Sequence, residues 1–149
     1  MNDRAVQVHA AITELQRLTQ LFADRRAQLA RAAALTEQQW QVLEEIATEH
    51  FMPSLFARAR DSSAAGVSRT LRQLLEKQLI AVSVSPADGR QRQYGLTAKG
   101  ARTMARLRTA RQSAIDAIWL DLDPGGIRAF TRFARTLAER LEQYLGRPD

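Results

Sequence analysis

The sequence predicts a mainly helical fold that contains one small β-hairpin. Two observations carry this prediction: long segments repeat apolar residues every three or four positions, and one stretch alternates apolar and polar residues. Capping and turn residues mark the boundaries between these segments. The 149 residues are 45% hydrophobic and 26% charged, which is typical of one globular domain, so we expect residues 1–149 to form a single domain.

The first 30 residues contain neither Pro nor Gly, and their apolar positions step by three and four. This spacing predicts one long helix whose apolar stripe includes Val8, Leu15, Phe22 and Leu29. The segment also carries charges where a secretory signal would need an apolar core.

Three shorter helices are expected next. Thr36 with Gln39 at the third helical position forms a capping box, which predicts a helix through residue 46. Pro53 suits the first turn of a short helix. The following helix is expected to run to about Lys77, and its candidate caps are Asp61, Ser62 and Ser63.

A hairpin and two helices complete the chain. Ile80, Val82 and Val84 alternate with the small residues Ala81, Ser83 and Ser85. Residues 86–89 supply a turn, and residues 91–96 form the returning strand. Thr97 is expected to cap the next helix, and Asp123 with the proline after it begins the last one.

Helices followed by a hairpin in this order are typical of a winged helix-turn-helix, here residues 35–97. The flanking segments, residues 1–34 and 98–149, carry apolar stripes that a small central module cannot cover. Burial of apolar surface contributes about 25 cal/mol per Å². We therefore expect the flanking segments to be dimerisation helices that pair with a second copy of the chain in a two-fold homodimer.

The net charge of +6 favours a polyanionic partner, and its distribution supports this preference. Residues 58–92 hold seven basic and three acidic side chains, and residues 99–111 hold five basic and no acidic ones. Twenty of the 22 basic residues are arginine, whose planar fork suits phosphate and guanine edges.

The helix over residues 62–77 has two distinct sides at about 100° per residue. Val67, Leu71, Leu74 and Leu75 are expected to face the core. The other side is small and polar first and then basic, as expected of a helix that enters a major groove. The candidate contacts to double-stranded DNA on this helix are Ser62, Ser63, Ala65, Gly66, Ser68, Arg69, Arg72 and Gln73.

The hairpin adds a second candidate contact to DNA. Arg90 and Arg92 share strand parity, and a basic tip of this kind can insert an arginine into a narrow minor groove. Asp88, two residues before Arg90, is expected to hold its guanidinium by a charge-assisted hydrogen bond.

Residues 35–100 resemble the MarR-type winged-helix transcriptional regulators. The resemblance rests on Leu-Thr-Glu-Gln-Gln-Trp from residue 35, Val-Ser-Arg-Thr-Leu from residue 67 with Leu-Glu-Lys from residue 75, and Asp-Gly-Arg from residue 88. Leu-Thr-Ala-Lys-Gly from residue 96 follows that last motif at the family's spacing. The chain departs from the family at Gly89, which is often arginine, and at Gln78, which replaces a helix-ending glycine.

The resemblance implies a homodimer that binds a pseudo-palindromic operator and regulates transcription, and we expect a repressor. It places Ser62, Ser63, Arg69 and Arg72 in the major groove and Arg90 in the minor groove. It also implies small aromatic ligands between the dimer helices and the DNA-binding lobe, and the candidate lining residues are Phe22, Trp40 and Phe51.

Other kinds of chemistry find little support in the sequence. The chain has no cysteine, two histidines and no catalytic or nucleotide-binding motif, so we expect no enzyme, cofactor or metal site. The absence of cysteine fits a reducing compartment such as the cytoplasm. The sequence contains no long uncharged apolar run, so no membrane-spanning helix is expected. Two alternatives remain: a winged-helix interaction module that binds an acidic protein partner, and a ligand-binding protein without affinity for DNA.

Overall fold

The structure, a computed structural model, describes residues 2–48, 51–60, 62–84 and 92–147. Helices dominate these residues, and one antiparallel hairpin joins them, so the predicted fold class is confirmed. The chain forms two compact units, residues 1–109 and residues 110–149, and the boundary between them falls within a long helix.

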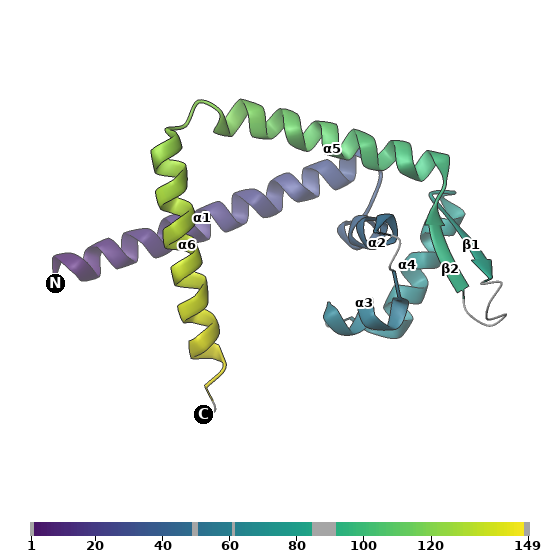
Figure 1. Cartoon of the computed structure of the whole chain (residues 1–149), viewed down its shortest axis with the longest axis horizontal. Coiled ribbons are helices and arrows are strands. Elements are labelled where there is room, and N and C mark those ends of the chain that lie inside the picture. The colour runs from purple at the N-terminus through teal and green to yellow at the C-terminus, as the bar shows by residue number, and fades with distance from the viewer. Residues whose placement is uncertain (1, 49–50, 61, 85–91, 148–149) are drawn as a thin grey trace. The chain divides into compact units, whose positions relative to one another are not determined.

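The first unit begins with α1 (Asp3–Ala32), the long helix expected from the apolar spacing. Three short helices follow, α2 (Glu37–Ala47), α3 (Pro53–Ala59) and α4 (Ala64–Glu76). Strands β1 (Ile80–Val84) and β2 (Arg92–Leu96) then pair antiparallel, with Ile80 opposite Leu96 and Val84 opposite Arg92. Figure 1 shows α2, α3, α4 and the two strands gathered into one lobe.

The predicted caps account for where these helices begin. Thr36 and Gln39 form both hydrogen bonds of the capping box, and Pro53 occupies the first turn of α3. Ser63, one of three candidate caps, accepts the N–H of Gly66 at 3.0 Å and begins α4. Each of these bonds satisfies a backbone group that the first turn of a helix leaves without a partner.

The core of the lobe lies between α2 and α4. Its most deeply buried side chains are Trp40, Val42, Leu43, Ile46, Val67 and Leu74. On α4 the buried positions are 67, 70, 71 and 74, which follow the helical repeat. Leu75 was expected in the core but is 36% exposed, whereas Thr70, which was not expected there, is 5% exposed.

Two turns in the lobe have a left-handed residue that is not glycine. Ala34 after α1 and Gln78 after α4 have φ of 56° and 58°. At the second turn the Leu79 N–H donates to the Leu74 oxygen and the Gln78 N–H to the Leu75 oxygen, both at 3.0 Å. This is the Schellman arrangement, so Gln78 adopts the conformation that glycine usually supplies, and α4 ends where the family pattern predicts.

Helix α5 (Ala98–Trp119) begins against this turn. Thr97 caps it through the Gly100 N–H at 3.0 Å, and its hydroxyl donates to the Gln78 oxygen at 2.6 Å. Gly100 is buried so tightly that an added Cβ would lie 2.0 Å from the Leu79 oxygen. The threonine and glycine of the Leu-Thr-x-x-Gly motif therefore join the end of α4 to the start of α5.

The second unit holds the rest of α5 and α6 (Pro124–Leu145), which Asp123 caps as expected. No residue of α6 is buried, and its exposed apolar side chains include Phe130, Phe133, Leu137 and Leu141. In the described part of the chain, no helix has the length and apolar character needed to cross a membrane.

Candidate nucleic-acid interface

Helix α4 presents a small, polar first turn and then two arginines. Ser63, Ala65 and Ser68 are exposed, and Gly66 is half-buried. A Cβ on Gly66 would lie 3.1 Å from the Ser63 hydroxyl, so this glycine leaves room for the cap. The first turn of α4 therefore has only small side chains and is accessible to solvent, as close approach to a groove requires.

Arg69 and Arg72 lie on the exposed side of α4, one turn apart. Neither guanidinium forms an ion pair or a hydrogen bond with another described residue. Arginine donates five N–H groups in a planar fork, and these two forks are available to a partner. These two guanidinium groups are the charged hydrogen-bond donors that this surface offers to a partner.

The other predicted contacts lie in different environments. Ser62 is half-buried, and its hydroxyl donates to the Arg60 oxygen at 3.3 Å. Gln73 is also half-buried, and its Oε1 accepts from Gln39 Nε2 at 2.9 Å. The Gln73 side chain thus turns toward α2 rather than out with the arginines.

At the hairpin, Arg92 is exposed as the first residue of β2. Its strand neighbour Tyr94 is half-buried, with its ring centroid 5.9 Å from that of Phe51. Asp88 and Arg90 lie outside the described residues, so their predicted contacts remain predictions.

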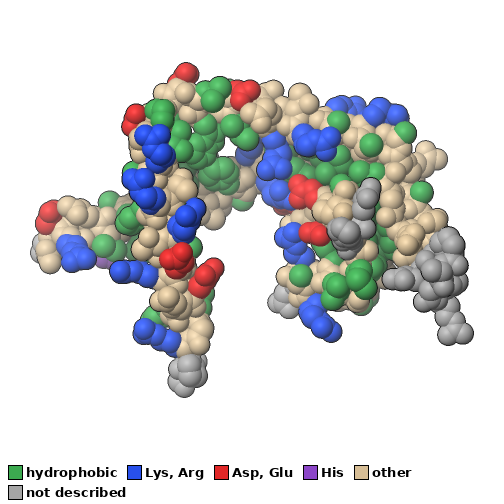
Figure 2. Space-filling model, viewed as in Figure 1, with side chains coloured by type: hydrophobic (Ala, Val, Ile, Leu, Met, Phe, Trp, Pro, Cys, Tyr) green, Lys and Arg blue, Asp and Glu red, His purple; other side chains and the backbone are tan. Residues whose placement is uncertain are grey.

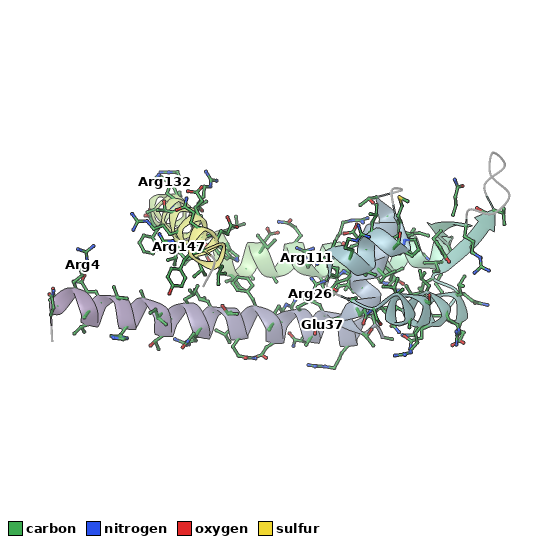
Figure 3. The ribbon with its side chains drawn as sticks, turned by 90° about the horizontal axis from the view of Figure 1, so that it is seen from below. Arg4, Arg26, Glu37, Arg111, Arg132 and Arg147 are labelled. Carbon is green, nitrogen blue, oxygen red and sulfur yellow. The ribbon has the colours of Figure 1, made fainter. Side chains whose placement is uncertain are left out.

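The three candidate ligand-binding aromatics occupy different places. Trp40 is 2% exposed, and the Arg26 guanidinium lies 4.1 Å from the centroid of its ring. Figure 3 shows Arg26 near Glu37, whose carboxylate is 3.9 Å away. Phe22 is 58% exposed on α1.

Phe51, the third, lines a hollow beside α3. The other lining residues are Glu45, Met52, Leu55, Phe56, Ala59 and Arg60. Phe22 and Trp40 are not among them, so the structure does not bring the three candidates together. Figure 2 shows apolar side chains gathered at the surface over α3.

A polar network at the other end of α4 was not predicted. The Lys77 ammonium donates to the Ala34 carbonyl at 2.6 Å and to Gln39 Oε1 at 2.8 Å. Gln39 is only 3% exposed. The capping box predicted a local role for Gln39, but no local pattern indicated its hydrogen bonds to residues 34 and 38 positions away.

Comparisons with known proteins agree with this architecture. The sequence model of the MarR family matches residues 35–91. No protein of curated function matches the chain in sequence. The resemblance that the motifs indicated is therefore confirmed over residues 35–91.

Solved structures extend the likeness to the whole chain. A MarR-family transcription regulator has a TM-score of 0.83 at 15% identity, covering 99% of both chains. A Staphylococcus aureus MepR mutant bound to an oligodeoxyribonucleotide has a TM-score of 0.67 at 18% identity, covering 88% of this chain and 97% of the other. Staphylococcus aureus MarR in complex with salicylate and kanamycin has a TM-score of 0.73 at 18% identity, covering 93% and 94%. At these identities the comparisons establish the fold.

Proposed function

We propose that this chain, which has the MarR-type fold and matches the MarR family over residues 35–91, is a sequence-specific DNA-binding transcription regulator. It binds double-stranded DNA as a homodimer at a pseudo-palindromic operator and acts as a repressor. One observation carries the proposal: α4 exposes Arg69 and Arg72, without described partners, beyond a first turn of small residues.

The contacts follow from the chemistry of this surface. Ser63, Ala65 and Ser68 allow the start of α4 to approach the major groove closely. Arg69 then donates two hydrogen bonds to guanine O6 and N7. Arg72 contacts either a neighbouring base edge in the major groove or a phosphate. Arg90 contacts the minor groove beside the hairpin, with Asp88 orienting it.

Exposed apolar surface supports the homodimer. Along α1, Val8, Ile12, Leu15 and Leu18 are each more than a third exposed, and α6 has no buried residue. Apolar faces of this extent are seldom left in water, because covering them is worth about 25 cal/mol per Å². Two copies place two α4 helices on the DNA, about 34 to 36 Å apart if they read successive turns.

A small aromatic ligand is the candidate effector. The hollow that Phe51, Phe56 and Met52 line supports this part of the proposal, because it combines aromatic and thioether surface with the Arg60 side chain. The Arg60 guanidinium lies 3.5 Å from the Glu45 carboxylate, which lines the same hollow. Salicylate, which is present in the MarR complex, is the first probe. We expect it to raise the melting temperature of the wild type more than that of Phe51→Ala; an equal shift would place the ligand elsewhere.

Substitution of Arg69 tests the proposed reading of DNA. We expect Arg69→Ala to weaken binding to the chain's own upstream promoter by about 1 to 3 kcal/mol and to relax base preference at one position. Arg102→Ala is the matched control, since Arg102 is an exposed arginine on α5. Fluorescence anisotropy with labelled duplexes measures both variants.

Two results would oppose the proposal. If Arg69→Ala binds the promoter within twofold of the wild type, Arg69 does not read a base. Equal weak binding to promoter and shuffled DNA, with a shallow salt dependence, would instead favour an acidic protein partner.

A further inference from the structure

Lys77 lies at the end of α4 that is farther from the exposed first turn. Its ammonium contacts two oxygens from other elements, the Ala34 carbonyl between α1 and α2 and the Gln39 side chain on α2. Both distances, 2.6 and 2.8 Å, are those of short charge-assisted hydrogen bonds. The positive charge of Lys77 is thus bound by oxygens of the protein itself.

Gln39 connects this lysine to the rest of the lobe. Its Oε1 also accepts the Thr36 N–H at 3.1 Å, and its Nε2 donates to Gln73 on α4 at 2.9 Å. A buried amide is costly unless its hydrogen-bonding groups are satisfied, and here both ends have partners. The network therefore holds α4 to α2 and to the turn after α1 in one arrangement.

Helix α5 holds the same end of α4 from its own first turn. The Lys99 ammonium donates to the Lys77 carbonyl at 2.9 Å, and the Thr97 hydroxyl donates to the Gln78 carbonyl at 2.6 Å. The final turn of α4 is therefore bonded to α2, to α5 and to the turn between α1 and α2.

Because this network lies at the last turn of α4, a change in it can displace the first turn of the same helix. A helix of 13 residues is about 20 Å long, so a tilt of about 10° at its last turn moves its first turn by about 3 Å. Recognition requires side chains to be held within about 0.5 Å of their productive places. A small change at Lys77 would therefore misplace Ser63 and Arg69.

We propose that Lys77 is a positioning residue, which sets the direction of α4 through Gln39 and the Ala34 carbonyl and makes no contact with DNA. The inference rests on the proposed function, because direction matters only if α4 reads a groove. Lys77 thus has a different role from Arg69 and Arg72, which are proposed to contact DNA, although all three are basic residues of one segment.

The test compares Lys77→Met and Gln39→Met with the conservative Gln39→Glu. Glutamate can still accept from Lys77 and Thr36, and the Gln73 amide can turn to donate to it. Anisotropy at several salt concentrations gives the promoter-to-shuffled affinity ratio and the salt slope, at a temperature where each variant is folded. Hydrogen exchange of the Gln78 and Leu79 amides reports whether the end of α4 has loosened.

We expect both methionine variants to lose about tenfold in the affinity ratio and to exchange faster at these amides, with Gln39→Glu close to the wild type. The salt slope should stay unchanged, since no phosphate contact is lost. A slope that falls by about one would make Lys77 a phosphate contact. An unchanged ratio, even with a lower melting temperature, would reduce Lys77 to a stabilising residue. A wild type without promoter preference would refute the proposed function itself.

Discussion

At the scale of single residues, Gly100 decides how closely α5 approaches the end of α4. An added Cβ would meet the Leu79 carbonyl at 2.0 Å, and that atom belongs to backbone held by the turn. We expect Gly100→Ala to lower the free energy of unfolding by about 2 kcal/mol or more, in the upper part of the overpacking range. Urea unfolding measures the effect.

Gly95 provides the matched control for this substitution. It lies in β2 with nothing within 4 Å of an added Cβ, and its φ is not positive. Gly95→Ala should leave stability unchanged or raise it slightly, because alanine restricts the unfolded chain. Equal losses for the two variants would refute the steric explanation.

Substitution by glycine at the two left-handed residues should stabilise the protein, whereas Gly100→Ala should destabilise it. A non-glycine residue in this conformation costs roughly 1 to 2 kcal/mol, so Ala34→Gly and Gln78→Gly should each stabilise the protein by about 1 kcal/mol. Ala105→Gly, at an exposed position inside α5, should destabilise it by about 1 kcal/mol. Thermal unfolding of the three variants checks this, and a loss at positions 34 or 78 would contradict the assigned turns.

At the scale of elements, the capping box fixes the start of α2. Thr36→Ala removes the hydroxyl that accepts the Gln39 N–H at 3.1 Å, and it should cost about 1 kcal/mol of stability. Thr109→Ala removes a threonine from an exposed position inside α5 and should be neutral or slightly stabilising. Similar losses at both positions would mean that the cap adds nothing.

Sequence patterns predicted the helices and strands because caps and apolar spacing are local signals. Thr36, Ser63, Thr97 and Asp123 each begin a helix that the sequence had placed. The buried side of α4 was only partly predicted. Helical spacing alone could not decide whether Leu75 or Thr70 would complete the buried face of α4.

The candidate site was predictable to a smaller degree. Exposed arginines on α4 follow from the helical repeat, and their exposure is as expected. The inward turn of Gln73 and the contacts of Lys77 depend on Gln39 and Ala34, which lie far away in sequence. Long-range polar contacts of this kind leave no periodic signal.

At the scale of the whole molecule, the exposed apolar side chains of α6 predict self-association. Leu137 and Leu141 are 42% and 55% exposed and lie on one face of the helix. We expect sedimentation to give twice the chain mass of 16.7 kDa for the wild type. Leu137→Glu should shift the protein toward monomer, because a buried carboxylate without a partner is costly.

Arg135→Glu is the matched control, since position 135 lies on the opposite side of α6. It introduces the same carboxylate outside the apolar face and should remain dimeric. A wild type that sediments as a monomer at micromolar concentration would show that the apolar face of α6 does not mediate dimerisation.

Sequence-specific binding of DNA by this fold is decided by one comparison of affinities. Fluorescence anisotropy compares the chain's own upstream promoter with a shuffled duplex of equal length, from about 50 to 200 mM salt. We predict promoter binding at least a hundredfold tighter, with a steep salt dependence. Equal affinity for the two duplexes at every salt concentration would contradict the claim.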